Sequence, residues 1–299
     1  MTTSTTTTGA VSSTRAATAP RRPRRDRVRG WDRVQPVVAV LVVVLLLGVP
    51  LWMVVVTSAK PQAEAQNPNL ALPQQWQMLE NYRTVWEDGR VLDAFVGSAL
   101  ILAPTIAIVL TVGSLASWIL ARRGGRVLAV VYAIGISGIV LPPAVVTVVL
   151  LLRQLGIDGT IPGMVGVYVG MYLSTVIFFV TGFVRTVPPE LEEAARVDGA
   201  KPLTVFFRII LPLLRPVLAT ATILISLYVW NDVFYAFFVV GGRVDTLPLN
   251  LFQVASAGLY LENWHLIFAY VVLMSLPLLV VFAVAQRRII SGVTSGAVK

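Results

Sequence analysis

Side chains able to bind or react gather in one polar stretch, residues 185–215, of an otherwise apolar chain. The stretch holds four acidic and five basic residues, and long apolar segments lie on either side of it. Mixed charges in a loop between apolar segments favour contact with another protein over catalysis. We call residues 185–215 the polar loop and predict that it is a docking surface.

Catalytic chemistry has little support elsewhere in the chain. The absence of cysteine excludes disulfides, thiolate nucleophiles and Cys-based zinc sites. One histidine, His265, and one acid within an apolar run, Asp232, do not make a catalytic constellation. No G-x-x-x-x-G-K-[ST] phosphate loop is present, so we expect any ATP to be hydrolysed by another chain. We therefore predict a non-catalytic protein that binds neither a metal nor a cofactor.

Composition indicates an integral membrane protein. Of the 299 residues, 56% are hydrophobic and 13% charged, and the mean hydropathy is +0.78. The net charge of +9 does not predict nucleic-acid binding, because the basic residues flank the apolar runs.

Residues 1–33 form a separate block of Thr, Ser and Ala that ends in a basic run. We expect a disordered cytoplasmic arm attracted to anionic lipid. Paired arginines before an apolar run also suggest a twin-arginine export signal. The run from Val37 to Val56 has the length of a membrane span, which favours a retained anchor.

Six apolar runs of spanning length follow, and together they predict an all-α domain of six transmembrane helices over residues 34–299. They show no polar alternation, and inside lipid only helices or closed barrels satisfy the backbone. The runs lie between Arg33 and Lys60, Asp93 and Arg122, Arg126 and Arg153, Asp158 and Arg185, Arg215 and Arg243, and Glu262 and Arg287.

The distribution of Lys and Arg sets the orientation. With the N-terminus inside, 19 of the 24 basic residues lie on the inner side. We therefore predict a multi-pass plasma membrane protein with both termini and the polar loop in the cytoplasm. The long outer segment from Ser58 to Ala94 is expected to form a cap of short helices.

The polar loop is expected to hold two helices. Pro188-Pro189 followed by Glu190, Glu192 and Glu193 favours a helix start, and Gly199 favours its end. A second short helix places an apolar stripe on one side. An amphipathic pair lying on lipid is the alternative, but the acidic residues oppose an anionic leaflet. The stripe consists of Leu203, Phe206, Phe207 and Ile210.

The spacing of the loop resembles the EAA signature of permease subunits of binding-protein-dependent ABC importers. Glu193-Ala194-Ala195 is followed by Gly199, then by Ile209, Leu211 and Pro212. Further segments resemble the carbohydrate-uptake, maltose-type branch of that family. They are Asn81-Tyr82, Leu141-Pro142-Pro143, Trp230-Asn231-Asp232-Val233-Phe234, Thr246-Leu247-Pro248-Leu249 and the end of the chain from Gln286.

The resemblance implies a type I importer fold and a set of ATPase-coupling residues. These are Glu190, Glu193, Ala194, Ala195, Asp198, Gly199, Phe206, Ile209, Leu211 and Pro212. The cytoplasmic tail, residues 286–299, is expected to touch the ATPase through Gly292, Thr294, Gly296 and Lys299.

The resemblance also implies partners. They are a second homologous permease subunit, two ATPase subunits that hold ATP and Mg, an extracytoplasmic solute-binding protein and a sugar substrate. A non-sugar solute remains open, and an ion-coupled carrier would require more titratable groups than Asp232. The family's Asn-Ser pair at the start of the second span is Gly97-Ser98 here, and a tyrosine late in that span is Trp118.

Within the spans, the candidate substrate path consists of Tyr228, Asn231 and Asp232. Charged groups in a span are costly and usually face a cavity or a partner. Asp232 lies toward the outer end of its run, so a structural hydrogen bond is an equally open interpretation.

Overall fold

The computed structural model describes residues 30–140, 143–256 and 263–297, without the side chains of residues 30–33 and 284–297. The disordered arm expected over residues 1–33 lies almost wholly outside the described residues. The chain divides into two units, Met1–Gly48 and Val49–Lys299, and each is described by itself.

In the first unit, helix α1 (Gly30–Val43) continues into a π-helical turn, η1 (Val44–Gly48). Its valine and leucine side chains are largely exposed. An apolar helix with exposed side chains is suited to face lipid, and Val34–Ser58 is long and apolar enough to cross a membrane.

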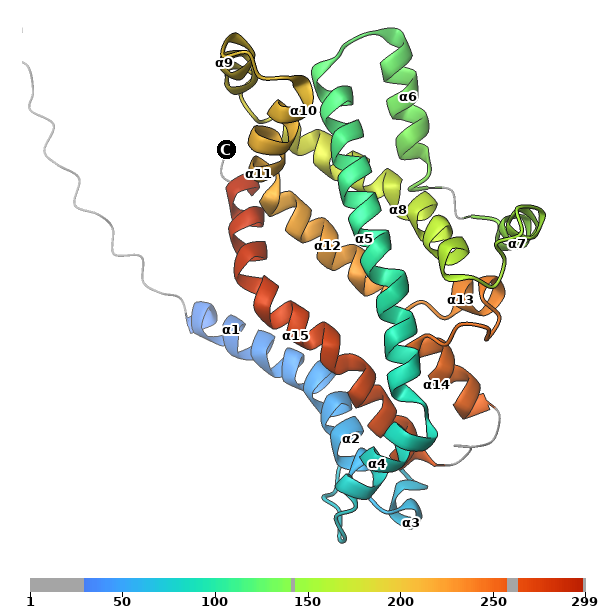
Figure 1. Cartoon of the computed structure of the whole chain (residues 1–299). Helices are drawn as coiled ribbons and strands as arrows, with labels where there is room; N and C mark the ends of the chain where they lie inside the picture. The colour runs from blue at the N-terminus through green and yellow to red at the C-terminus, as the bar shows by residue number, and fades with distance from the viewer. Residues whose placement is uncertain (1–29, 141–142, 257–262, 298–299) are drawn as a thin grey trace, which may run out of the picture. The chain divides into compact units, whose positions relative to one another are not determined.

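Helices and the loops that join them make up the described residues of the second unit (Figure 1). Its helices are α2 (Val49–Ser58), α3 (Gln62–Ala65), α4 (Met78–Asp88), α5 (Val91–Arg122), α6 (Arg126–Ser137), α7 (Val145–Gln154), α8 (Ile161–Val184), α9 (Glu190–Val197), α10 (Pro202–Val205), the π-helical η2 (Phe206–Ile210), α11 (Leu211–Leu213), α12 (Arg215–Trp230), α13 (Phe234–Val239), α14 (Leu247–Ser256) and α15 (Trp264–Ala297).

The predicted all-helical fold class is confirmed. The prediction that each apolar run forms one helix is wrong for two of the six runs. Among the described residues, four continuous helices are long and apolar enough to cross a membrane. A fifth span is counted if the pair Pro202–Leu213 and Arg215–Trp230, bent by 74°, is taken as one.

The run from Arg126 to Arg153 forms two helices, α6 and α7, rather than one. The sequence places Pro142 and Pro143 between them. Consecutive prolines remove two backbone donors, and their rings clash with the preceding turn. The hydropathy of the run does not reveal this break, because both helices are apolar.

The run from Arg215 to Arg243 is also divided, into α12 and α13. The break falls at Asn231–Val233, where the Asp232 carboxylate accepts hydrogen bonds from the backbone N–H groups of Tyr235 and Ala236. An aspartate that binds the first N–H groups of a helix starts that helix. Asp232 therefore precedes α13 and binds its first turn, instead of lying within a continuous span.

Helices α5 and α8 pack along each other and form the centre of the second unit. A Cβ atom at Gly113 would lie 2.6 Å from Cγ1 of Val176, and the Ser117 hydroxyl donates to the Ile177 carbonyl at 3.3 Å. Small residues that allow such close approach are the usual means of helix association in lipid.

At the outer end, α3 and α4 form the short helices expected in the segment that follows the first span. The buried Asn81 side chain donates to the carbonyls of Ser58 and Lys60, both at 2.9 Å. The buried Lys60 ammonium donates to Asn69 Oδ1 at 2.8 Å. These bonds fold the outer segment back onto the end of α2.

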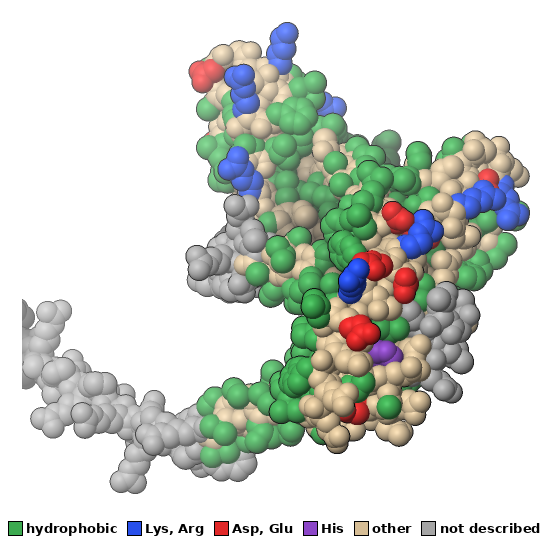
Figure 2. Space-filling view, turned by 60° about the horizontal axis from the view of Figure 1, so that its bottom comes forward, with side chains coloured by type: hydrophobic (Ala, Val, Ile, Leu, Met, Phe, Trp, Pro, Cys, Tyr) green, Lys and Arg blue, Asp and Glu red, His purple; other side chains and the backbone are tan. Residues whose placement is uncertain are grey.

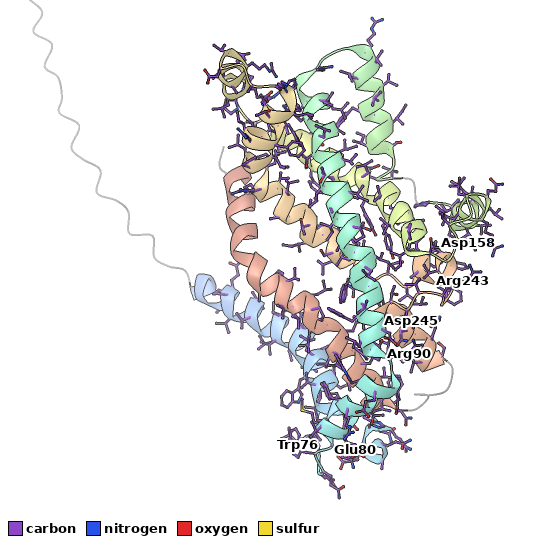
Figure 3. All side chains as sticks on the ribbon, in the orientation of Figure 1. Trp76, Glu80, Arg90, Asp158, Arg243 and Asp245 are labelled. Atoms are coloured by element: carbon purple, nitrogen blue, oxygen red, sulfur yellow. The ribbon has the colours of Figure 1, made fainter. Side chains whose placement is uncertain are left out.

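The start of α5 is bound to the segment before α14. Ser98 Oγ accepts from the Leu247 backbone N–H at 2.9 Å, and Arg90 pairs with Asp245 at 3.6 Å. Arg243 pairs with Asp158 nearby at 3.2 Å, and both pairs are visible in Figure 3.

Charged side chains gather at the ends of the second unit. Figure 2, which brings the outer end forward, shows acidic and basic groups on that end and hydrophobic side chains over much of the flank behind it. Exposed leucine, valine and phenylalanine side chains on α5, α8 and α15 belong to this apolar surface. Its apolar character agrees with a position in a membrane.

We predict that Gly97→Ala destabilises the protein, because a Cβ atom there would collide with the backbone carbonyl oxygen of Asp245. A backbone atom cannot move aside cheaply, and we expect a loss of about 1–3 kcal/mol. Thermal unfolding of the detergent-purified protein measures the effect. Gly166→Ala is the matched control, because nothing lies within 4 Å of a Cβ atom at that position. Equal stability of the two variants would contradict the close packing at Gly97.

Candidate functional site

The first half of the polar loop forms helix α9, as predicted. Pro189 occupies the N-cap position, and three glutamates stand in the first turn. Acidic groups in that turn complement the partial positive charge of the helix N-terminus. The chain turns after the helix at Gly199, whose φ of +81° lies in the left-handed region that favours glycine.

Most of the predicted coupling residues on α9 and in the turn directly after it are exposed. Glu190, Glu193, Ala194, Asp198 and Gly199 are exposed, and Ala195 is half-buried. Of the signature residues, Glu193, Ala194 and Ala195 lie on this small helix at the inner end of the second unit, and Gly199 follows it (Figure 1).

The second half of the polar loop is largely packed against the protein. Phe206 is completely buried, and its ring centroid lies 5.6 Å from that of Trp118. Ile209, Leu211 and Pro212 are half-buried. The expected apolar stripe therefore divides: Phe206 and Ile210 enter the core, while Leu203 and Phe207 are exposed.

A π-helical turn, η2, separates α10 from α11 just before Pro212. Proline lacks a backbone donor, and its ring clashes with the carbonyl four residues earlier. The wider turn relieves that clash, and the Leu211 N–H bonds the Phe206 carbonyl instead. The chain then bends by 74° into α12.

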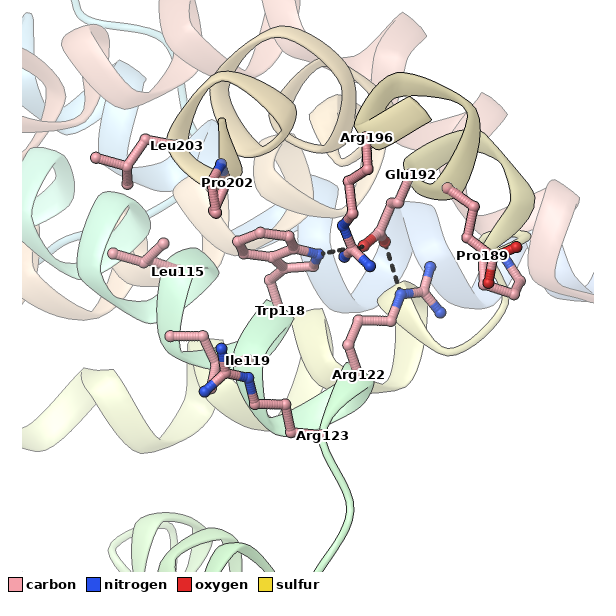
Figure 4. A pocket seen from close by; sticks show the side chains of 11 residues that line it. Leu115, Trp118, Ile119, Arg122, Arg123, Pro189, Glu192, Arg196, Pro202 and Leu203 are labelled. Carbon is pink, nitrogen blue, oxygen red and sulfur yellow. Dashed lines mark hydrogen bonds and ion pairs between the residues drawn. The ribbon is translucent and has the colours of Figure 1, made fainter. Parts of the chain in front are cut away.

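Glu192 is a buried carboxylate held by three donors (Figure 4). The indole N–H of Trp118 donates to Oε2 at 3.0 Å, Arg122 Nε donates to Oε1 at 2.7 Å, and Arg196 Nη2 donates to Oε2 at 3.2 Å. The Glu192 side chain is 2% exposed. A charge is stable at such burial only when it is paired and hydrogen-bonded, and these three donors supply both.

Sequence reasoning did not identify Glu192, Trp118 and Arg122 as functional residues. The sequence pattern places Glu192 only at the helix start and marks Trp118 only as a departure from the family pattern. Arg122 gave a signal, because a basic residue that ends a long apolar helix often has an acidic partner. The sequence did not show which glutamate of the polar loop supplies that partner.

A cavity of about 560 Å³ lies between the inner end of α5 and the polar loop. Figure 4 shows its lining side chains, which come from α5, α9 and α10. They include the apolar Leu115, Ile119 and Leu203 as well as the charged Arg123 and Arg196.

In the candidate substrate path, the Asp232 carboxylate has structural partners. Besides binding the start of α13, its Oδ2 accepts from the Tyr168 hydroxyl at 2.8 Å. Tyr168 is buried on α8, so Asp232 ties α13 to the central helix pair. The structural hydrogen bond considered from the sequence is thus present.

The other two candidate path residues are exposed. Tyr228 is 56% exposed, and its ring stacks on that of Tyr172 with centroids 5.8 Å apart and an interplanar angle of 7°. Asn231 is exposed and donates to the Leu227 carbonyl at 2.8 Å. An exposed aromatic face beside an amide is suited to contact a polar ligand that has apolar faces.

The predicted contacts of the tail are only partly within the described residues. Gly292, Thr294 and Gly296 lie on the final helical turns of α15, where the backbone alone is described. Lys299 lies outside the described residues.

Known proteins resemble the chain over most of its length. Residues 110–295 match the family described as "Binding-protein-dependent transport system inner membrane component". The melibiose/raffinose/stachyose import permease protein MelC of Bacillus subtilis is 35% identical over 226 residues, which cover 73% of this chain and 80% of MelC. The diacetylchitobiose uptake system permease protein NgcG of Streptomyces coelicolor is 29% identical and covers 84% of each chain.

A solved structure has the same fold. A chain of a bacterial ABC transporter involved in the import of the acidic polysaccharide alginate aligns with a TM-score of 0.74 at 21% identity. The alignment covers 90% of this chain and 99% of that chain. The expected type I importer permease fold is therefore confirmed.

We predict that Asp232→Ala lowers the free energy of unfolding by about 1–2 kcal/mol, because two N–H groups in the first turn of α13 and the buried Tyr168 hydroxyl lose their carboxylate acceptor. Thermal unfolding in detergent measures the change. Asn231→Ala, at the neighbouring exposed position, is the control and is expected to stay within about 0.5 kcal/mol of the wild type. If Asp232→Ala were no less stable than this control, the structural role of Asp232 would be refuted.

Proposed function

The chain belongs to the family of binding-protein-dependent transport system inner membrane components, and on this premise we propose that its polar loop couples transport to a separate ATPase. The protein is a membrane-embedded permease subunit of an ABC importer in the bacterial plasma membrane. Helix α9 would enter a cleft of the ATPase and carry its nucleotide-driven movement into the spans.

The exposed surface of α9 is the observation that carries this proposal. Its signature residues Glu193 and Ala194 are exposed, whereas Glu192 on the same helix is buried and fixed to α5. A short helix that is anchored on one side and free on the other presents a preformed surface to a partner. Ala194 and Gly199 are exposed and small, so the partner can approach the backbone closely at these two positions.

The charges of α9 favour a protein partner over a lipid surface. Glu190, Glu193 and Asp198 are exposed together with Val197, which is 88% exposed. Carboxylates are repelled by the anionic cytoplasmic leaflet, so a helix lying on lipid should not present them. A protein surface with basic groups around an apolar pocket complements both features.

A second permease subunit is the proposed partner within the membrane. An open groove of about 810 Å³ runs between α5 and the α11–α12 segment. It is lined by Thr111 and Thr222 as well as by leucine and alanine side chains. Hydroxyl groups on a spanning surface favour contact with protein over contact with lipid. Two homologous subunits would enclose a path that neither forms alone.

The proposed substrate is a sugar or oligosaccharide, delivered by an extracytoplasmic binding protein. The names of the relatives that act on melibiose, raffinose, stachyose and diacetylchitobiose support this class. The exposed Tyr228 ring and the Asn231 amide fit it chemically, since sugars stack on aromatic rings and bind amides. ATP and Mg would be held by the partner ATPase, with no cofactor on this chain.

We predict that Glu193→Lys and Gly199→Asp abolish the ATP hydrolysis that the loaded binding protein stimulates, while the complex stays assembled. The first places a reversed charge in the proposed interface. The second places a side chain at a position with φ of +81°. ATPase activity of the reconstituted complex, with and without binding protein, measures the effect.

Glu87→Lys is the matched control, because it reverses an exposed glutamate in a helix at the opposite end of the second unit. Surface pairs such as Arg83–Glu87 contribute about 0–1 kcal/mol, so normal stimulation is expected. Normal stimulation in both loop variants would refute the coupling proposal.

The substrate class is tested by purifying the intact complex and screening its binding protein against sugars, amino acids and polyols by calorimetry. We expect saturable binding of a sugar or oligosaccharide. Binding confined to a non-sugar solute would contradict the proposed substrate and leave the importer assignment unchanged.

A further inference from the structure

The inner end of α5 is fixed to the polar loop by the bonds around Glu192, and we propose that these bonds form the link through which movement of α9 reaches the spans. We call the set Glu192, Trp118 and Arg122 the Glu192 joint. Glu192 is then a positioning residue for transport. The inference rests on the proposed function, because it requires an ATPase to move the polar loop.

Two residues of α5 bind the same carboxylate. Trp118 and Arg122 are four positions apart, so they lie on one face of the helix and reach the two oxygens of Glu192 separately. Arg122 also donates through Nη2 to the Val187 carbonyl at 2.7 Å, just before α9. The guanidinium thus holds both the helix and the chain that leads into it.

Polar bonds to the Glu192 carboxylate connect α9 to α5. The cavity of about 560 Å³ occupies the space between them. The Glu192 and Arg122 side chains are 2% and 17% exposed, so solvent screens their attraction little. Removing one partner of a buried ion pair leaves an uncompensated charge, which makes separation of the pair costly. Such a link passes a displacement of α9 on to α5 instead of breaking.

Trp118 also contacts the returning half of the polar loop. Its ring packs against Phe206 with centroids 5.6 Å apart, and η2 leads from Phe206 toward α12. The indole therefore touches both halves of the loop, one through its N–H and the other through its ring. Displacement of α9 acts on α5 and on the entry to α12 together.

The joint is tested with Trp118→Phe and Glu192→Gln in the complete reconstituted complex. Phenylalanine keeps a ring against Phe206 but removes the N–H donor, and glutamine keeps the shape of Glu192 but removes its charge. We expect hydrolysis stimulated by the loaded binding protein to fall about tenfold in kcat, the loss typical of one hydrogen bond to a charged group. The KM for ATP should not change, since ATP is bound elsewhere.

Arg123→Gln is the matched control. Arg123 lines the same cavity and follows Arg122 in the chain, but it is exposed. Arg122→Gln makes the same change of charge at the joint and should reproduce the loss seen with Glu192→Gln. Equal effects of the Arg122 and Arg123 variants would overturn the proposal, because net charge would then explain both.

A distance measurement separates transmission from simple destabilisation. The chain contains no cysteine, so spin labels can be placed at Ile119 on α5 and Leu191 on α9, both exposed. In the otherwise unchanged complex we expect one narrow distance distribution in each nucleotide state. In Trp118→Phe and Glu192→Gln the distribution should broaden, although the complex stays assembled.

The outcomes distinguish the joint from the coupling proposal on which it rests. If Glu193→Lys abolishes stimulation while the Trp118 and Glu192 variants keep full stimulation and a narrow 119–191 distance, the joint is refuted and the coupling loop stands. If Glu193→Lys keeps full stimulation, the coupling proposal fails and the inference fails with it.

Discussion

Close packing between α5 and α8 is the interaction on which the rest of the second unit depends. Lipid gives helices no hydrophobic drive to associate, so contact requires small residues such as Gly113 that let side chains like Val176 approach. Helices α12 and α14 pack on α5, and Tyr168 of α8 fixes Asp232 at the start of α13. A loose α5–α8 pair would leave these elements without a common support.

The length of α5 gives this pair its functional meaning. Its 32 residues extend about 48 Å, whereas the hydrocarbon core of a bilayer is about 30 Å thick. The helix is therefore longer than the hydrocarbon core is thick. The outer end binds the first residue of α14 through Ser98, and the inner end binds the polar loop through Arg122. One continuous helix thus connects the side where substrate arrives to the side where the ATPase is proposed to act.

Local signals were predictable from the sequence, and long-range partnerships were not. Prolines, glutamates and Gly199 set the bounds of α9 within a few residues, because caps act over one turn. The burial of Glu192 depends on Arg122, 70 positions away, and no local pattern encodes it. Hydropathy found every apolar run, yet it did not register that Asp232 starts a new helix. Phe206 lies on the predicted stripe but packs inward against Trp118.

The division of the polar loop into an exposed and a buried side explains why its signature is informative. The exposed residues of α9 are available to a partner, and the buried ones hold the helix in place. A surface of this kind is expected to keep its geometry before the partner arrives, which reduces the entropy lost on binding.

Cross-linking from α9 tests the central claim most directly. Because the chain has no cysteine, Ala194→Cys provides a single exposed attachment point for a short photoreactive label in the intact complex. The account predicts that mass spectrometry identifies the cross-linked partner as an ATP-hydrolysing subunit, with a yield that changes when ATP is bound. Cross-links to lipid alone, in a complex that still transports, would contradict it.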